Sequence, residues 1–231
     1  MEPNPFIVIS GKMFSGKDTL ADDLARRLRA GGRTAHRLTF SDVLCTEADP
    51  GIDAMRTAPA GDVVAAVADA AALTQEHAAE FVEAILPDLR DDPELIARKR
   101  TPGTRFVLQH LGREWRPEGY WAKKVIETCI QLRDHGDAGV LSGPVIMVGA
   151  RFPEEYELAQ AAGAFTVRLD ISAAEQDARS MARDGHLPDE AARNHLGETI
   201  LDDRDDFDLR LTTDGMSPEE VADKVWAEMP R

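Results

Sequence analysis

The sequence predicts an α/β protein of three layers, α/β/α, in which helices cover both faces of a parallel central sheet of about five strands. Short runs of β-branched and apolar residues alternate with helical patterns along most of the chain. The first run, Ile7-Val8-Ile9, is continuously apolar, as expected for a strand that is buried on both faces of a parallel sheet. A chain of 231 residues is also long enough to bury such a core.

Five segments have the composition of β-strands, and helical patterns separate most of them. They are Phe6–Ser10, Thr34–Phe40, Val145–Val148, Phe165–Leu169 and Phe207–Leu211. A helix is predicted from Gly16 to Ala30, because leucines recur there at four-residue spacing before a basic last turn and two glycines. This helix and the strands that flank it form a βαβ unit, which we expect to be right-handed.

Residues 1–231 are predicted to form a single domain that carries a helical insert at residues 43–125. Within the insert, the stretch from Cys45 to about Arg100 is rich in Ala, Asp and Glu, and it has two or three helical patterns with little strand signal. Val63–Leu73 consists mainly of Ala and Val. We interpret it as a packed helix, because it is too short to cross a membrane.

The composition argues against several classes of protein. Lys and Arg total 27 and Asp and Glu total 42, so the net charge is −15, which argues against a protein that coats long nucleic acid or anionic lipid. Cys45 and Cys129 have no metal-binding or redox spacing, so we expect buried free thiols in a reducing compartment. Because no leader pattern and no long apolar segment are visible, we expect a cytoplasmic protein without a membrane span.

The sharpest feature is the segment Gly11–Thr19, here called the phosphate loop, which lies between the first predicted strand and the first predicted helix. Its backbone N–H groups can converge on phosphate oxygens, the helix N-terminus adds partial positive charge, and Lys17 can reach the β- and γ-phosphates of ATP. The pattern therefore predicts a P-loop fold that binds ATP. The predicted phosphate contacts are Gly11, Lys12, Ser15, Gly16, Lys17, Asp18 and Thr19.

The match to G-x-x-x-x-G-K-[ST] is incomplete, because Asp18 stands where a hydroxyl that binds Mg²⁺ is usual, and Thr19 follows it. A carboxylate is electrostatically favourable at a helix N-terminus. Three roles are open for Asp18: direct contact with Mg²⁺, contact through water, or capping of the helix. Asp18 is therefore a candidate metal ligand. The alternative for the whole segment is a plain glycine turn with a surface lysine.

Phosphoryl transfer needs positive charge around the transferred group and an acceptor held in line, and arginines in three segments are candidates to supply both. Residues 105–121 combine guanidinium groups with aromatic faces on which a base can stack. Arg151 follows the strand Val145–Val148, where the binding crevice of an open parallel sheet lies. The alternatives are an amphipathic helix with solvated arginines for the first segment and a surface charge for Arg151.

Residues 172–199 form the third segment and are predicted to act as a lid. Arg179 and Arg183 are four residues apart, so they share a helix face and are placed to close over the triphosphate. A solvated helix is the alternative. The candidate catalytic residues are Lys17, Arg151, Arg179 and Arg183.

Two further segments contain side chains of the kind that bind metals. The acidic run Asp202–Asp208 is either a metal cluster or a solvated turn before the last strand. His186 and His195 have no metal-binding spacing with the two cysteines, so no zinc site is predicted.

These segments, in this order, resemble the phage-type deoxynucleoside monophosphate kinases. The likeness lies in the phosphate loop with its G-K-x-x-S-G-K-D-T form and in four later motifs: Phe40-Ser41-Asp42, Leu108–Glu114, Val148–Glu154 and His195–Asp208. The resemblance implies a nucleoside-monophosphate-kinase-like fold, ATP and Mg²⁺ as co-substrates, and a deoxynucleoside diphosphate as product. It also implies that the acceptor contacts include Asp42, Gln109, Arg116, Trp121 and Arg151.

The predicted acceptor site combines these contacts with neighbouring charged residues. Its members are Asp42, Arg105, Gln109, Arg113, Glu114, Arg116, Trp121 and Arg151. Asp42 is the second candidate ligand for Mg²⁺, because the family usually has an acidic residue at the position of Gly149, and this chain lacks it. The family's H-x-S-E motif also loses its hydroxyl in His195-Leu196-Gly197-Glu198.

Two other functions are open. Phosphomevalonate kinases of the animal type have a similar G-K-D loop, so the acceptor can be another phosphorylated metabolite, although Trp115 and Trp121 favour a flat base. A nucleotide-binding protein without kinase activity is the third interpretation, and Gly149 favours it. In each case we expect small-molecule nucleotides as ligands, with a homodimer open as the state of assembly.

Overall fold

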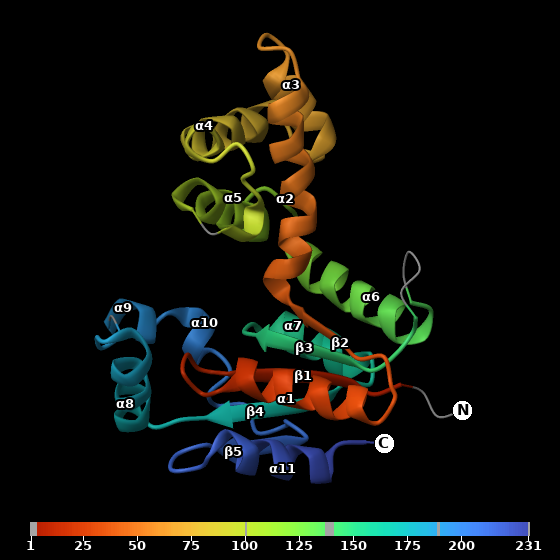
Figure 1. Cartoon of the computed structure of the whole chain (residues 1–231), viewed down its shortest axis with the longest axis vertical. Helices are drawn as coiled ribbons and strands as arrows, with labels where there is room; N and C mark the ends of the chain where they lie inside the picture. Colours follow the sequence, from red (N-terminus) through yellow and green to blue (C-terminus); the bar gives the residue numbers. More distant parts are fainter. Residues whose placement is uncertain (1–3, 100, 137–140, 189, 231) are drawn as a thin grey trace. The chain divides into compact units, whose positions relative to one another are not determined.

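The computed structural model describes residues 4–99, 101–136, 141–188 and 190–230, and within it the chain divides into two compact units. The sheet unit comprises residues 1–39 and 122–231, and the helical unit comprises Phe40–Trp121. Figure 1 labels the elements of both units. The helical unit covers nearly the same residues as the predicted insert, 43–125.

Five parallel strands form the central sheet, in the order β2-β3-β1-β4-β5. Their bounds are Phe6–Gly11 (β1), His36–Thr39 (β2), Val145–Ala150 (β3), Phe165–Asp170 (β4) and Leu209–Thr212 (β5). Each strand corresponds to one of the five predicted segments, so the predicted parallel sheet is confirmed.

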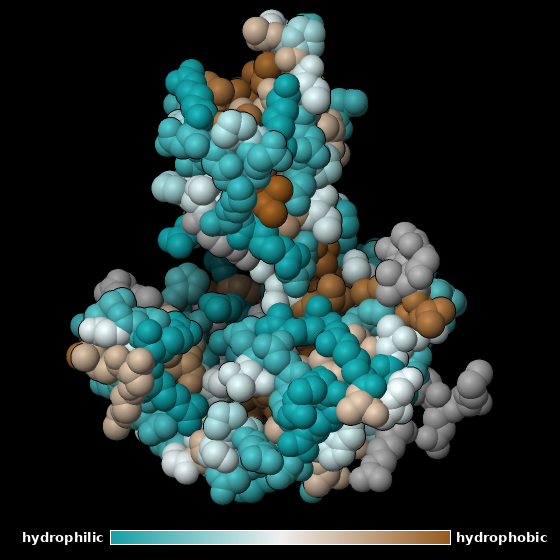
Figure 2. Space-filling view, in the orientation of Figure 1, coloured by the Kyte–Doolittle hydropathy of each residue, from teal (hydrophilic) through white to brown (hydrophobic). Residues whose placement is uncertain are grey.

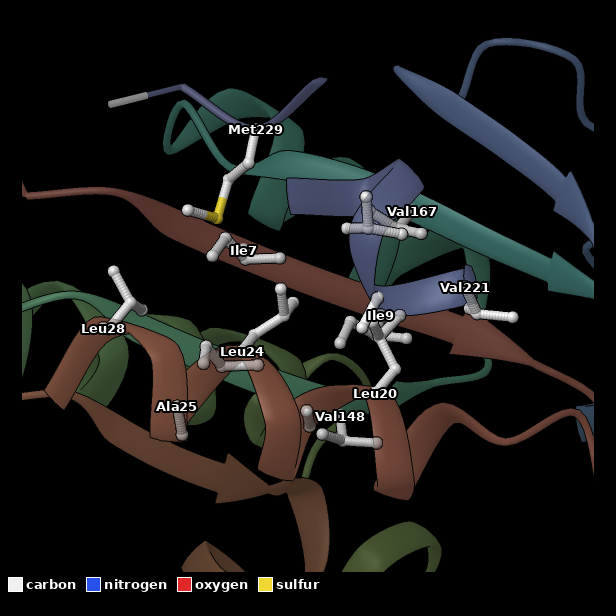
Figure 3. Close-up of a cluster of buried hydrophobic side chains, with 14 of the residues drawn as sticks. Ile7, Ile9, Leu20, Leu24, Ala25, Leu28, Val148, Val167, Val221 and Met229 are labelled. Atoms are coloured by element: carbon white, nitrogen blue, oxygen red, sulfur yellow. The ribbon is translucent and has the colours of Figure 1, made fainter. Parts of the chain in front are cut away.

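Helices cover both faces of this sheet. On one face, α1 (Lys17–Ala30) and α11 (Pro218–Glu228) enclose a hydrophobic core with the central strands. Figure 3 shows the leucines of α1, including Leu24, against Ile7 and Ile9 of β1. Because side chains alternate along a strand, Val8, which lies between these two isoleucines and is also buried, faces the opposite side of the sheet. The predicted three-layer architecture is therefore confirmed.

The opposite face of the sheet packs against α7 (Pro153–Ala161), whose Tyr156 is fully buried beside Phe207. After β4, the described residues of the predicted lid segment include the helices α8 (Ala173–Asp184), α9 (Glu190–Arg193) and α10 (Leu196–Thr199). The boundary between the two units falls inside α6 (Tyr120–Asp134).

The described part of the helical unit contains four α-helices and one short 3-10 helix that lie wholly within it. They are α2 (Phe40–Thr57), α3 (Val63–Ala70), α4 (Gln75–Asp91), the 3-10 helix η1 (Ala97–Lys99) and α5 (Pro102–Arg113). Thr74 and Thr101 begin α4 and α5 by accepting backbone N–H groups from the first turn of each helix. Phe81 packs closely against Gly51, where an added Cβ would lie 2.8 Å from the ring.

Several predicted boundaries differ from the structure by one to three residues, and three of these differences are described here with their local setting. The second strand ends at Thr39, because Phe40 already begins α2. The predicted helix Val63–Leu73 ends at Ala70, since Ala72 has a left-handed backbone with φ of +49°. The last strand begins at Leu209, because Asp208 instead uses its carboxylate to accept hydrogen bonds from β4.

The surface hydropathy and the state of the two cysteines can be read directly from the structure. The face of the molecule in Figure 2 is mainly hydrophilic. Among the described residues, no helix combines the length and the apolar character that crossing a membrane requires. Cys45 and Cys129 are both buried and free, and burial raises the pKa of Cys129 to about 12, so this thiol stays protonated at neutral pH.

The packing between α1 and the sheet predicts how much stability is lost when a core side chain is shortened. Leu24 is fully buried, so Leu24→Ala should lower the free energy of unfolding by about 2–5 kcal/mol through lost burial and a residual cavity. Urea denaturation measures this change. Leu187 is 55% exposed and is the control, because Leu187→Ala should change stability by less than about 0.5 kcal/mol. Equal effects of both substitutions would contradict the described packing.

Candidate active site

The phosphate loop turns sharply between β1 and α1. Gly11 and Gly16 both have positive φ, +154° and +88°, and the N–H of Ser15 donates to the carbonyl of Lys12 at 3.2 Å. A Cβ on Gly11 would lie 2.6 Å from Oγ of Ser15 and 2.8 Å from the carbonyl oxygen of Leu169. The backbone therefore requires glycine at position 11, which allows β1 to end against β4 and the loop to fold back over it.

Phe14 is held in a left-handed conformation, with φ of +64°. This region is unfavourable for a bulky residue and is typical of functional loops. Two arginines of α8 contact Phe14: Nη1 of Arg179 donates to its carbonyl at 3.2 Å, and the guanidinium of Arg183 lies 4.3 Å from the ring centroid. The two arginines of the predicted lid thus both contact the phosphate loop.

A pocket of about 410 Å³ lies beside the loop within the sheet unit. The loop and the start of α1 form one part of its wall, and α8 with the start of α11 forms the rest. The lining residues are Met13, Phe14, Ser15, Gly16, Lys17, Asp18, Thr19, Leu20, Glu175, Arg179, Arg183, Met216, Pro218 and Val221. The pocket therefore joins a positively polarised helix N-terminus to an apolar surface, a combination that suits a phosphorylated compound with a flat apolar group.

Lys17 lies at the first position of α1. Its Nζ donates to the carbonyl of Lys12 at 3.2 Å, which holds the ammonium over the loop. Burial lowers the pKa of Lys17, and the negative charge of Glu198 offsets part of this effect. A partly desolvated ammonium in this position is a strong partner for a phosphate group.

Ser15 carries a second polar group that points to a ligand. Its side chain is 1% exposed, and Oγ has no hydrogen-bond partner among the described residues. Buried hydroxyl groups almost always have a partner in folded proteins. An anion held by the loop would supply one, and the role of Ser15 as a phosphate contact stays a prediction.

Glu198 connects the phosphate loop to Arg151. One carboxylate oxygen accepts the backbone N–H of Met13 at 2.6 Å, and the other accepts from Nη1 of Arg151 at 2.7 Å. The side chain of Glu198 is only 3% exposed. The motif His195-Leu196-Gly197-Glu198 was noticed in the sequence, but no role for Glu198 was predicted from it.

Arg168 and Asp202 form a second support for the loop that was missed in the sequence. Arg168, in the middle of β4, is buried and donates to Oγ of Ser10 at 3.0 Å. It also pairs with Asp202 at 2.5 Å, and Asp202 pairs in turn with Nζ of Lys12 at 2.6 Å. The sequence signal for this pair is Arg168 itself, a basic residue within the apolar strand Phe165–Asp170, because a buried arginine needs a carboxylate partner.

In the acidic run Asp202–Asp208, three of the five carboxylates have protein partners: Asp202, Asp206 and Asp208. Asp206 pairs with Arg204 at 3.0 Å, and Asp208 accepts the N–H and the hydroxyl of Thr166. The described residues contain no group of three or more His, Cys, Asp or Glu side chains that could hold a metal ion. The interpretation as a solvated turn therefore fits the structure better than a metal cluster.

The two candidate metal ligands lie in different units. Asp18 is 62% exposed and pairs with Arg37 of β2 at 2.7 Å, and the residue that caps α1 is Gly16. Asp42 lies in the first turn of α2 and pairs with Arg98 at 2.9 Å. Asp18 lines the pocket, whereas Asp42 belongs to the helical unit.

Most of the predicted acceptor residues lie in the helical unit, and only Arg151 lies in the sheet unit. Those on and just after α5 are exposed: Arg105, Gln109, Arg113 and Glu114. Arg116 pairs with Glu47 at 2.9 Å and also donates to the carbonyls of Ala71 and Ala72, so its guanidinium braces the unit internally.

The two tryptophans of the helical unit, Trp115 and Trp121, are buried. Trp121 is 7% exposed and its Nε1 donates to the carbonyl of Leu111. Trp115 is equally buried and stacks on His77 with ring centroids 5.6 Å apart. Both indole rings therefore contribute to the packing of the helical unit.

Gly149 occupies a bulge in β3. Ile9 pairs with Val148 and Ser10 pairs with Ala150, so Gly149 is the extra residue, and its φ is +92°. A carboxylate-bearing residue would be strained there.

No protein-family model matches this chain, and no curated protein matches it in sequence. Solved structures that match over nearly the whole chain include those of an APS kinase and a thymidylate kinase. APS kinase CysC of Mycobacterium tuberculosis in complex with AMPPNP and APS has 16% identity and a TM-score of 0.46, with 98% of this chain and 97% of that chain covered. A cysteine-to-alanine mutant of the same protein has 14% identity and a TM-score of 0.42, with 98% and 96% covered.

The third structure is thymidylate kinase from Candida albicans, with 13% identity, a TM-score of 0.40, and 97% of this chain and 90% of that chain covered. Similarities at this level do not assign the chain to a family. The interpretation of the site therefore rests on the contacts described above.

The environment of Lys17 predicts a pH dependence of anion binding. Its pKa is lowered from 10.5, so the ammonium should lose its proton, and triphosphate affinity should fall, at a lower pH than for an exposed lysine. Calorimetric titration with ATP between neutral pH and pH 10 measures this fall. The variant Lys17→Arg stays charged over the same range and should give a flatter profile. Identical profiles for both proteins would rule out Lys17 as the titrating group.

The bulge at Gly149 predicts a conformational cost for any side chain. No atom lies within 4 Å of an added Cβ, so Gly149→Ala should destabilise the protein by about 1–2 kcal/mol through the backbone alone. Gly61 also has open space around its Cβ and does not have a positive φ. Gly61→Ala is therefore the matched control, with no loss expected. Urea denaturation of both variants checks the difference.

Proposed function

We propose that this protein transfers the γ-phosphoryl group of ATP to a small phosphorylated acceptor, with a deoxynucleoside 5′-monophosphate as the first choice. The observation that carries the proposal is the phosphate loop with Lys17 over it, which opens into a pocket of nucleotide size. The buried hydroxyl of Ser15 supports an anion at this place.

The pocket supports a defined orientation of the donor. The phosphates lie along the N-terminus of α1, from Gly16 to Thr19, where backbone N–H groups and the helix dipole favour negative charge. The base lies against the apolar residues at the start of α11, Met216, Pro218 and Val221. Arg179 keeps the two parts together, because it binds both Phe14 of the loop and Thr213 after β5.

In phosphoryl transfer a protein mainly supplies positive charge and holds the donor and the acceptor in line, and it forms few covalent bonds itself. In this proposal Lys17 stabilises the charge that develops on the transferred group. Arg151 supplies a second positive charge. It lies near Met13 of the loop, because the carboxylate of Glu198 accepts hydrogen bonds from both residues. Arg183 lies over Phe14 and is placed at the pocket wall.

The residues at the start of α1 fit a magnesium ion that is bound mainly by phosphate oxygens and water. Mg²⁺ in kinases commonly has only one or two protein ligands. Asp18 and Thr19 offer a carboxylate and a hydroxyl beside the phosphate positions, and both line the pocket. When bound, Mg²⁺ neutralises charge between the phosphates.

The choice of a deoxynucleoside monophosphate as acceptor is supported by the resemblance and by the exposed polar face of α5, which includes Arg105, Gln109 and Arg113. The burial of Trp115 and Trp121 specifically favours a second candidate. Neither indole presents an open face on which a base can stack. The second candidate is therefore an acceptor without a base, such as a phosphomevalonate-like compound.

A single acceptor screen tests the proposal and separates these candidates. Purified protein is incubated with radiolabelled ATP and Mg²⁺ and with a panel of deoxynucleoside and ribonucleoside monophosphates and aliphatic phosphates. We expect a labelled diphosphate from at least one deoxynucleoside monophosphate. Turnover only with aliphatic phosphates would select the second candidate.

The variant Lys17→Met is the control for the site, since loss of a preorganised charge contact should lower kcat by about 10²–10³-fold. The outcome that would refute a kinase is no turnover with any acceptor in protein that binds ATP. That outcome would instead support a nucleotide-binding protein without phosphoryl transfer.

A further inference from the structure

The buried carboxylate of Glu198 is a charged group for which phosphate binding alone gives no reason. Its side chain is 3% exposed, and it lies beside a loop that is built to hold anions. A buried carboxylate is costly unless charged or polar partners compensate for the lost hydration. Near an anion site it also repels the ligand, so it must contribute something that offsets this repulsion.

Two direct partners stabilise Glu198, and each belongs to the candidate site. The N–H of Met13 lies 2.6 Å from Oε2, and Nη1 of Arg151 lies 2.7 Å from Oε1. Among the charged groups that act on Lys17, Glu198 has the largest influence on its pKa. One side chain therefore touches the loop and an arginine that follows β3, and it lies close to the loop lysine.

The chain around Glu198 holds it in a defined position. His195 caps α10 by accepting the N–H of Gly197 at 3.1 Å. A Cβ on Gly197 would lie 3.3 Å from the ring of Phe152, so α10 packs closely against the turn that carries Arg151. That turn is fixed in the same way, because the carboxylate of Glu155 accepts the N–H groups of Arg151 and Phe152.

We propose that Glu198 is a positioning residue that orients the guanidinium of Arg151 and the amide of Met13 for the transferred phosphoryl group. The proposal rests on the proposed function for its effect on turnover. Glu198 does not need to contact the substrate in this role. Without it, Arg151, whose side chain is 44% exposed, would sample many rotamers in solvent.

The competing interpretation is that Glu198 is only an internal anion, which occupies the site until a phosphate displaces it. The two interpretations predict opposite effects on anion binding. If Glu198 positions the site, its neutralisation weakens binding, because the loop and Arg151 lose their common anchor. If Glu198 only competes, its neutralisation strengthens binding, because a repulsive charge is removed.

The experiment compares the wild-type protein with Glu198→Gln, which keeps the size of the side chain but cannot pair ionically with Arg151. Binding of inorganic tripolyphosphate is measured by calorimetry, and kcat and KM are measured with the best acceptor. We expect Glu198→Gln to weaken tripolyphosphate binding and to lower kcat by about tenfold or more. The exposed Glu228→Gln is the matched control and should change neither quantity.

A double-mutant cycle tests whether Glu198 acts through Arg151. In an Arg151→Ala background, Glu198→Gln should lower kcat by less than about threefold, because the partner that it orients is already absent. Glu198→Asp keeps the charge and should recover part of the lost activity, and a thermal melt checks that each variant is folded. Full additivity of the two substitutions would overturn the proposal.

The inference and the proposed function fail in different ways. Tighter tripolyphosphate binding by Glu198→Gln, or binding and turnover that match the wild type, would overturn the positioning role alone. A wild-type protein that binds tripolyphosphate but phosphorylates no acceptor would refute the kinase. In that case weaker binding by Glu198→Gln would still support the positioning role.

Discussion

The contacts between the phosphate loop and the chain from α8 to Asp202 are the constraint on which the site depends. The loop holds Phe14 in a left-handed conformation that costs about 1–3 kcal/mol, so the surrounding structure must overcome this cost. Separate contacts hold Lys12, Met13 and Phe14 of the loop. Asp202 binds the side chain of Lys12, Glu198 and Gln176 bind the amide and the carbonyl of Met13, and Arg179 binds the carbonyl of Phe14.

These contacts show that the segment predicted to act as a lid, residues 172–199, also supports the phosphate loop. Residues 172–199 were predicted to close over a bound triphosphate, and that motion stays a prediction. In the structure, however, α8 and α10 already contact the loop through buried and half-buried polar groups. A segment that supports the loop in this way cannot leave without releasing the strained backbone, so any opening has to be coupled to the shape of the loop itself.

The parts of the site that could be predicted from the sequence are those that local order determines. A strand, a glycine-bounded turn and a helix are consecutive in Phe6–Ala30, so their spacing fixes where Lys17 lies. Glu198 and Asp202 could not be found in this way, because they reach the loop from more than 180 residues along the chain, as the separation of 185 between Met13 and Glu198 shows. Trp121 was predicted to contact the acceptor, because the sequence shows an aromatic residue among arginines. The sequence does not show that neighbouring helices bury this ring, as they do in the structure.

The bulge in β3 also affects how positions along this strand can be compared. Side chains alternate between the faces of a sheet, and one inserted residue reverses that alternation for everything that follows. Ala150 therefore stands opposite Ser10, where a regular strand would place its predecessor. The residue two places before Arg151 is Gly149, which is the inserted residue and has no counterpart in a regular strand. A motif aligned by residue number at this point would pair side chains from opposite sides of the sheet, and only an alignment of the backbones restores their correspondence.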